Sequence, residues 1–138
     1  MWSVNQEIDN AISSLSIYSS DLVELDRESA REVINHIKGN FVEGNPSSWW
    51  MSLKKPVVTK VDVNDSDFGY IDEIIPQRCD TFYFVPENGE TYRVFRANID
   101  VIKKILAECI FFEYYIFPED FSWLIIENDH SEAMLIHV

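Results

Sequence analysis

Three short apolar runs separated by polar breaks occupy the last third of the chain, and they predict three consecutive β-strands. The runs are residues 111–117, 121–126 and 133–138, with a Pro-Glu-Asp break and an Asn-Asp-His break between them. Their aromatic and β-branched composition and their length are typical of strands rather than helices. Because both faces of the first two runs are mostly apolar, we expect an antiparallel meander that is covered on both sides.

Apolar residues at helical spacing predict three helices ahead of this meander. The first covers about residues 3–17. The second has Asp26 as its N-cap and ends where Gly39 supplies a C-terminal signal, and the third runs from an Asn98 N-cap to about Cys109. The third helix is expected to pack on the sheet and to lead the chain into the meander.

The segment between the second and third helices begins with a less regular stretch. Alternate residues of 57–63 form one valine-rich face and one mostly polar face, which is typical of an edge or half-exposed strand. One helical turn is expected at Trp49 and Trp50, and another over residues 69–75. The two tryptophans fit either an apolar plug under a loop or an aromatic anchor at a protein interface.

Residues 81–85 and 91–96 predict the most distinct hairpin. Asn88-Gly89 lies between them, and this dipeptide favours a type I′ turn because both central residues of that turn need a positive φ. The register that this turn implies places Phe82 opposite Phe95.

The predicted fold class is α+β. N-terminal helices pack on a five- to six-stranded, mainly antiparallel sheet, and one helix is inserted before a C-terminal three-stranded meander. A length of 138 residues and a hydrophobic content of 46% indicate one folded domain over residues 1–138.

Charge narrows the class of partner. The chain carries 24 acidic and 11 basic residues, a net charge of −13. This excess opposes binding to nucleic acid, where neutralising phosphates supplies most of the affinity, and it favours attraction to a basic protein. The first residues show no signal-peptide pattern and no apolar run approaches about 20 residues, so we expect a cytoplasmic protein without membrane contact.

Motifs for catalysis or cofactor binding are missing from the sequence. The four glycines build neither a phosphate-binding loop nor a nucleophile elbow. The cysteines, Cys79 and Cys109, and the three histidines lack zinc-ligand spacing, and the acidic turn at 64–67 lacks the Gly and the terminal Glu of an EF-hand. We therefore expect no metal, no cofactor and reduced thiols.

One polar constellation remains, at the second turn of the meander. Glu127, Asp129 and His130 lie there, and Glu113 is expected on the neighbouring strand. A carboxylate beside an imidazole can perform acid–base chemistry, whereas the simpler interpretation is a polar tight turn. The candidate binding residues are Trp49, Trp50, Glu113, Glu127, Asp129 and His130, and no catalytic residue is assigned.

The run FFEYYI…FSWLIIENDH, between residues 111 and 130, resembles the C-terminal block of a small family of uncharacterised bacterial proteins. In that block a Phe-Glu-Tyr strand precedes a Trp-Leu-Ile strand that ends in Glu-Asn-His. Asp129 stands here at the His position, so a histidine-based role does not transfer. Size, acidity and aromatic content are also similar to toxin-immunity proteins, although the Leu-Pro-Pro entry and Gly-rich strand of one widespread immunity superfamily are missing.

These observations favour a protein-binding module, of which an immunity or antitoxin-like inhibitor of a basic protein is one form. The alternatives are a small-ligand-binding protein or hydrolase-like enzyme that uses Glu113, Glu127 and His130, and a homodimeric structural protein. Trp123 shares its predicted strand face with Phe121 and is expected in the core, so the loop tryptophans are the better interface candidates.

Overall fold

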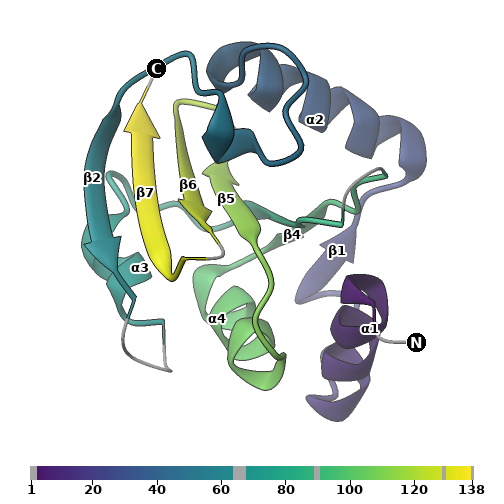
Figure 1. The fold of residues 1–138 in the computed structure, drawn as a ribbon. Coiled ribbons are helices and arrows are strands. Elements are labelled where there is room, and N and C mark those ends of the chain that lie inside the picture. Colours follow the sequence, from purple (N-terminus) through teal and green to yellow (C-terminus); the bar gives the residue numbers. More distant parts are fainter. Residues whose placement is uncertain (1–2, 64–67, 89–90, 129, 138) are drawn as a thin grey trace.

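The computed structural model describes residues 3–63, 68–88, 91–128 and 130–137, and over these residues one antiparallel sheet lies between two groups of helices (Figure 1). The sheet has seven strands in the order β1-β4-β3-β5-β6-β7-β2, and every neighbouring pair is antiparallel. The predicted α+β class is confirmed, with a larger sheet than expected. In chain order the elements are α1 (Val4–Ser14), β1 (Leu22–Glu24), α2 (Arg27–Phe41), a 3-10 turn (Trp49–Met51), β2 (Val57–Asp62), α3 (Tyr70–Ile74), β3 (Phe82–Pro86), β4 (Phe95–Ala97), α4 (Ile99–Glu108), β5 (Tyr114–Pro118), β6 (Trp123–Glu127) and β7 (Glu132–His137).

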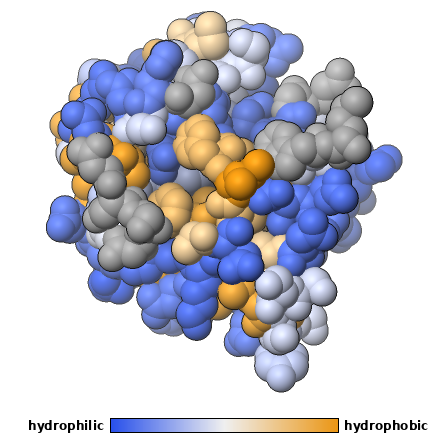
Figure 2. Space-filling view, turned by 60° about the horizontal axis from the view of Figure 1, so that its bottom comes forward, coloured by the Kyte–Doolittle hydropathy of each residue, from blue (hydrophilic) through white to orange (hydrophobic). Residues whose placement is uncertain are grey.

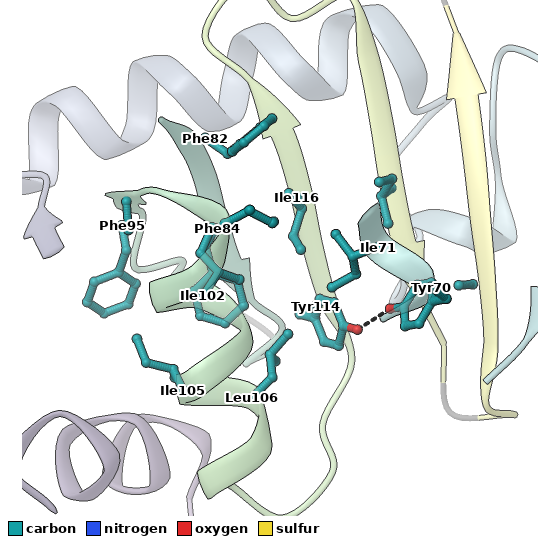
Figure 3. Close-up of a cluster of buried hydrophobic side chains, with 14 of the residues drawn as sticks. Tyr70, Ile71, Phe82, Phe84, Phe95, Ile102, Ile105, Leu106, Tyr114 and Ile116 are labelled. Atoms are coloured by element: carbon teal, nitrogen blue, oxygen red, sulfur yellow. Dashed lines mark hydrogen bonds between the residues drawn. The ribbon is translucent and has the colours of Figure 1, made fainter. Parts of the chain in front are cut away.

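The centre of the sheet is buried on both faces. All five residues of β5 and all five of β6 are buried, and successive side chains of a strand point to opposite faces. One face packs against α1, α3 and α4, and the other packs against α2 and Trp49 (Figures 1 and 3). The expectation of a meander covered on both sides is therefore confirmed.

The predicted helix starts are confirmed, whereas one predicted helix end is wrong. The Asp26 side chain accepts a hydrogen bond from Ser29 N at 2.8 Å, and Asn98 accepts one from Val101 N at 2.9 Å. Gly39 does not end α2, because the helix continues to Phe41, whose side chain is fully buried in the second core. Burial of an aromatic ring outweighs the weak helix propensity of one glycine.

The predicted β3–β4 hairpin forms, but in a register shifted by two residues. Phe84 lies opposite Phe95, and Phe82 lies opposite Ala97. A shift of two leaves every side chain on its expected face, since the strand period is two. Part of the expected Asn88-Gly89 turn lies outside the described residues. Before that turn the Glu87 N–H bonds to the Glu113 carbonyl at 2.9 Å, so the chain continues alongside β5 instead of folding straight back.

Two details of the predicted meander are wrong. Strand β5 begins at Tyr114, so Phe111 lies in the link from α4 and is exposed. Phe121 has a φ of +59° before β6 and does not share a face with Trp123. Its ring stacks at 3.9 Å on His36 of α2, on the opposite side of the sheet.

Strand β2 lies at one end of the sheet and pairs with β7, as an edge strand was expected to do. Val57 and Val58 are exposed on it. Homodimerisation through this edge stays a prediction.

The tryptophans divide between core and surface differently from the expectation. Trp123 is in the core, as expected. Trp49 is also fully buried, stacked on Tyr115 with ring centroids 3.8 Å apart. Its interpretation as an apolar plug is confirmed, and an exposed position for it is wrong, because the 3-10 turn packs it against the second core. Trp50 is half-buried.

Both buried tryptophans should contribute strongly to stability. We expect Trp123→Ala and Trp49→Ala each to lower the free energy of unfolding by about 3–5 kcal/mol, from lost burial and the cavity left behind. Met51→Ala, at an exposed position in the same 3-10 turn, should change it by less than about 0.5 kcal/mol. Urea denaturation measures all three variants. A Trp49→Ala variant as stable as Met51→Ala would contradict the assignment of Trp49 to the core.

Candidate functional site

A buried carboxylate marks the end of β6. Glu127 is 3% exposed, and its Oε1 accepts hydrogen bonds from the hydroxyls of Tyr114, at 2.5 Å, and Tyr70, at 3.0 Å. The two hydroxyl oxygens also lie within hydrogen-bonding distance of each other (Figure 3), so the two phenolic protons are shared among three contacts. Tyr114 is the direct cross-strand partner of Glu127, and such pairs share a face. Tyr70 begins α3 and covers the pair from above the sheet.

Burial is the largest influence on the pKa values of Glu127 and Tyr114. It raises the pKa of Glu127 above the ordinary glutamate value, although the hydrogen bonds from Tyr114 and Tyr70 act in the opposite direction. Burial also holds the pKa of Tyr114 well above that of a free tyrosine, reinforced by the proximity of Tyr70 and Glu127. The Tyr114 hydroxyl therefore keeps its proton. Within the described chain Glu127 forms no ion pair, so no cation compensates the buried carboxyl group.

An apolar cavity of about 270 Å³ opens beside the carboxylate. Among the described residues that line the cavity, only Glu127 carries a carboxyl group. Phe68 adopts a φ of +60°, an unfavourable backbone conformation for a bulky residue, and its ring contacts Tyr114 edge-on. The lining residues are Val63, Phe68, Leu106, Ala107, Cys109, Ile110, Phe111, Phe112, Tyr114 and Glu127.

The link between α4 and β5 supplies an exposed apolar part of the cavity lining. Ile110 is 60% exposed and Phe111 is 49% exposed. Figure 2 shows hydrophobic residues gathered within a hydrophilic surface on the underside of the molecule, where this link runs in Figure 1. The link is tied to α1, because the Ile110 N–H donates to Glu7 Oε1 at 2.9 Å. Glu108, which accepts a hydrogen bond from Ser14 at 3.1 Å, places a second carboxylate near this surface.

The structure does not bring the predicted polar constellation together. Glu113 lies on the other face of the sheet from Glu127, where its Oε1 accepts a hydrogen bond from Trp50 Nε1 at 3.3 Å. The His130 ring contacts the same Trp50 edge-on, with centroids 5.8 Å apart. Asp129 lies outside the described residues. Glu113, Trp50 and His130 thus form one group, and Glu127 belongs to another.

The turn after β6 owes its shape to Asn128. This side chain is fully buried, and its Oδ1 accepts hydrogen bonds from His130 N at 2.9 Å and Glu132 N at 3.1 Å. The interpretation of this segment as a polar tight turn accounts for that geometry. Because Asn128 follows Glu127 directly, the same turn fixes the end of β6 and the position of the carboxylate.

A second tyrosine–glutamate network lies on the α2 side of the sheet. Tyr115 donates to Glu87 Oε2 at 2.5 Å, Tyr92 donates to Glu87 Oε1 at 3.4 Å, and Trp49 Nε1 donates to the Tyr92 hydroxyl at 3.1 Å. Burial raises the pKa of Tyr92 to about 12 and that of Tyr115 further. The network anchors Trp49 and fixes the ring of Tyr92 at the surface.

Tyr70 and Tyr114 are the site residues that sequence reasoning missed. Tyr114 could have been found from the meander, since a short turn brings the start of β5 opposite the end of β6. Tyr70 carries no comparable signal, because its position depends on how α3 folds over the sheet.

We searched the part of the chain that the structure describes for metal-ligand clusters and for membrane-spanning helices. There, no group of three or more His, Cys, Asp or Glu side chains could hold a metal ion. Within the same residues, none of the helices has the length and apolar character needed to cross a bilayer.

By its fold, the protein is an α+β protein built on one antiparallel sheet, and the cavity beside Glu127 is a candidate site. The chain belongs to DUF6756, a family of unknown function, whose family model matches residues 1–137. No curated protein and no solved structure matches it. Membership confirms the expectation of an uncharacterised family and assigns no activity.

The raised pKa of Glu127 predicts a specific pH dependence of stability. The folded protein holds this proton to higher pH than the unfolded chain, so the stabilising contribution is complete below the unfolded pKa and is lost as pH rises through the folded pKa. Glu127→Gln keeps the Oε1 acceptor and removes the charge. Its free energy of unfolding relative to wild type should therefore increase as pH rises from below to above the pKa of Glu127.

Asp26→Asn is a control of opposite sign. The backbone hydrogen bond from Ser29 lowers the pKa of Asp26, so this variant should lose stability relative to wild type as pH rises. Urea denaturation across the pH range measures both differences. A Glu127→Gln difference that is flat, or that falls with pH, would contradict the environment described for the carboxylate.

Proposed function

We propose that the protein is a binding module for a basic protein partner, and that the cavity beside Glu127 receives a lysine or arginine side chain of that partner. One observation carries the proposal: an apolar cavity, lined at the surface by Ile110 and Phe111, has a buried carboxylate in its wall. An immunity or antitoxin-like inhibitor is one protein of this kind.

The cavity suits a cationic side chain in both size and chemistry. Its volume of about 270 Å³ is just below the roughly 300–1,000 Å³ of typical small-molecule sites. Lysine and arginine have apolar stems that can lie along apolar walls while the charged head reaches a polar group. The raised pKa of Glu127 shows that the free carboxylate is poorly stabilised, and a bound cation would relieve that cost.

The charge of the whole chain supports the same class of partner. A net charge of −13 attracts a basic protein over a distance set by salt screening. Exposed aromatic and aliphatic side chains at the centre of a contact, surrounded by charged groups, are typical of protein interfaces. Phe111 and Ile110 supply the apolar centre, and Glu7 and Glu108 lie beside it.

Side-chain analogues test the cavity directly. n-Butylguanidinium, an arginine analogue, should bind with a Kd of about 1 mM or weaker and shift the NMR signals of Ala107 and Phe111. n-Butanol should bind more weakly and valerate not measurably. Glu127→Gln should raise the Kd for n-butylguanidinium by about tenfold or more, because a charge-assisted hydrogen bond is worth roughly 1.5–3 kcal/mol.

Two surface variants separate this cavity from general surface charge. Phe111→Ser should weaken binding of n-butylguanidinium, since it removes part of the cavity lining. Met51→Ser changes another exposed apolar residue, in the 3-10 turn, and should leave n-butylguanidinium binding unchanged. Binding that is unchanged in Glu127→Gln, or equal for n-butylguanidinium and valerate, would refute the proposed role of the carboxylate.

A further inference from the structure

A second cavity lies along α2, on the opposite face of the sheet from Glu127. Its volume is about 450 Å³, which falls within the roughly 300–1,000 Å³ range of small-molecule sites. Most of the lining comes from one face of α2, and the rest comes from the segment before β4. The lining residues are Arg27, Arg31, Ile34, Asn35, Lys38, Thr91 and Tyr92.

Positive charge is concentrated in this cavity. Three of the chain's 11 basic residues, Arg27, Arg31 and Lys38, line it, although acidic residues outnumber basic ones by more than two to one overall. Among the described residues neither arginine forms an ion pair, and Lys38 Nζ donates only to the neutral Asn45 Oδ1, at 3.3 Å. With a rise of about 1.5 Å per residue, the three side chains start from points spread over roughly 16 Å of helix.

The arrangement does not serve the helix itself. Arg27 occupies the first turn of α2, where the helix dipole disfavours a cation. Arg31 lies one turn further on the same face, and like charges four residues apart on a helix repel. Asp26, Glu28 and Glu32 are close in sequence, but among the described residues none of these carboxylates forms an ion pair with either arginine. An anionic ligand would remove the cost of this arrangement.

We propose that this cavity binds a small phosphorylated molecule. The planar guanidinium forks of Arg27 and Arg31 match the oxygen geometry of phosphate, and Lys38 supplies a third cation for a second anionic group. Ile34 and the ring of Tyr92 provide an apolar wall for the organic part of the ligand. Long nucleic acid is disfavoured, since the net charge of −13 repels a polyanion outside the cavity.

Tyr92 gives the cavity a fixed wall. Its hydroxyl accepts a hydrogen bond from Trp49 Nε1 and donates to Glu87, so the ring is held from the core side. Its neighbour Trp49 is fully buried. A pre-positioned aromatic wall lowers the ordering cost of binding. The site is independent of the cavity beside Glu127, and neither proposal depends on the other.

Calorimetric titration with pyrophosphate and ADP, at constant ionic strength, tests the site. Both should bind saturably, and ADP should bind more tightly because of its organic part. Arg27→Gln combined with Arg31→Gln should weaken both by about tenfold or more. The matched control, Lys55→Gln combined with Lys104→Gln, removes two exposed charges outside the cavity and should leave binding unchanged.

Circular dichroism of the two double variants establishes that both are folded, which their exposed positions lead us to expect. If both double variants bind pyrophosphate and ADP equally weakly, the effect comes from overall charge, and the proposed site is refuted. Absence of saturable binding of either probe up to about 10 mM would also overturn it. Citrate at the same ionic strength separates the chemistries, and tighter binding of citrate than of pyrophosphate would overturn the assignment to phosphate.

Discussion

Burial of β5 and β6 on both faces is the constraint on which the rest of the structure depends. Alternate side chains of these strands pack into the two cores on opposite faces of the sheet, so each face must be covered by its own helices. A polar residue at the end of either strand then becomes buried with its neighbours. Glu127 is such a residue, and the hydroxyls of Tyr70 and Tyr114 satisfy it in place of water.

Much of the fold could be predicted because local signals and burial agree. The N-caps Asp26 and Asn98, the edge character of β2 and the two-sided meander all follow from residue type and period. Errors arose where tertiary packing decided the outcome. Burial of Phe41 extended α2 beyond Gly39, and pairing with β5 set the β3–β4 register in place of the expected short turn.

The candidate site was only partly predictable. Glu127 was identified as a candidate, but strand alternation separates it from Glu113, and the two carboxylates serve different faces. Trp49 illustrates a further limit: it lies in a short apolar piece between polar segments, yet its ring stacks on Tyr115 and is completely buried. A contact between residues 66 positions apart depends on tertiary structure that no local pattern encodes.

We propose above that the Glu127 carboxylate recognises a cation of the partner. The most direct measurement is the pKa of this carboxyl, followed by carbon-13 NMR in the free protein and in protein saturated with n-butylguanidinium. We expect a pKa above the ordinary glutamate value in the free protein and a lower pKa in the complex, because a neighbouring cation favours the charged form. A pKa that is unchanged on saturation would contradict it.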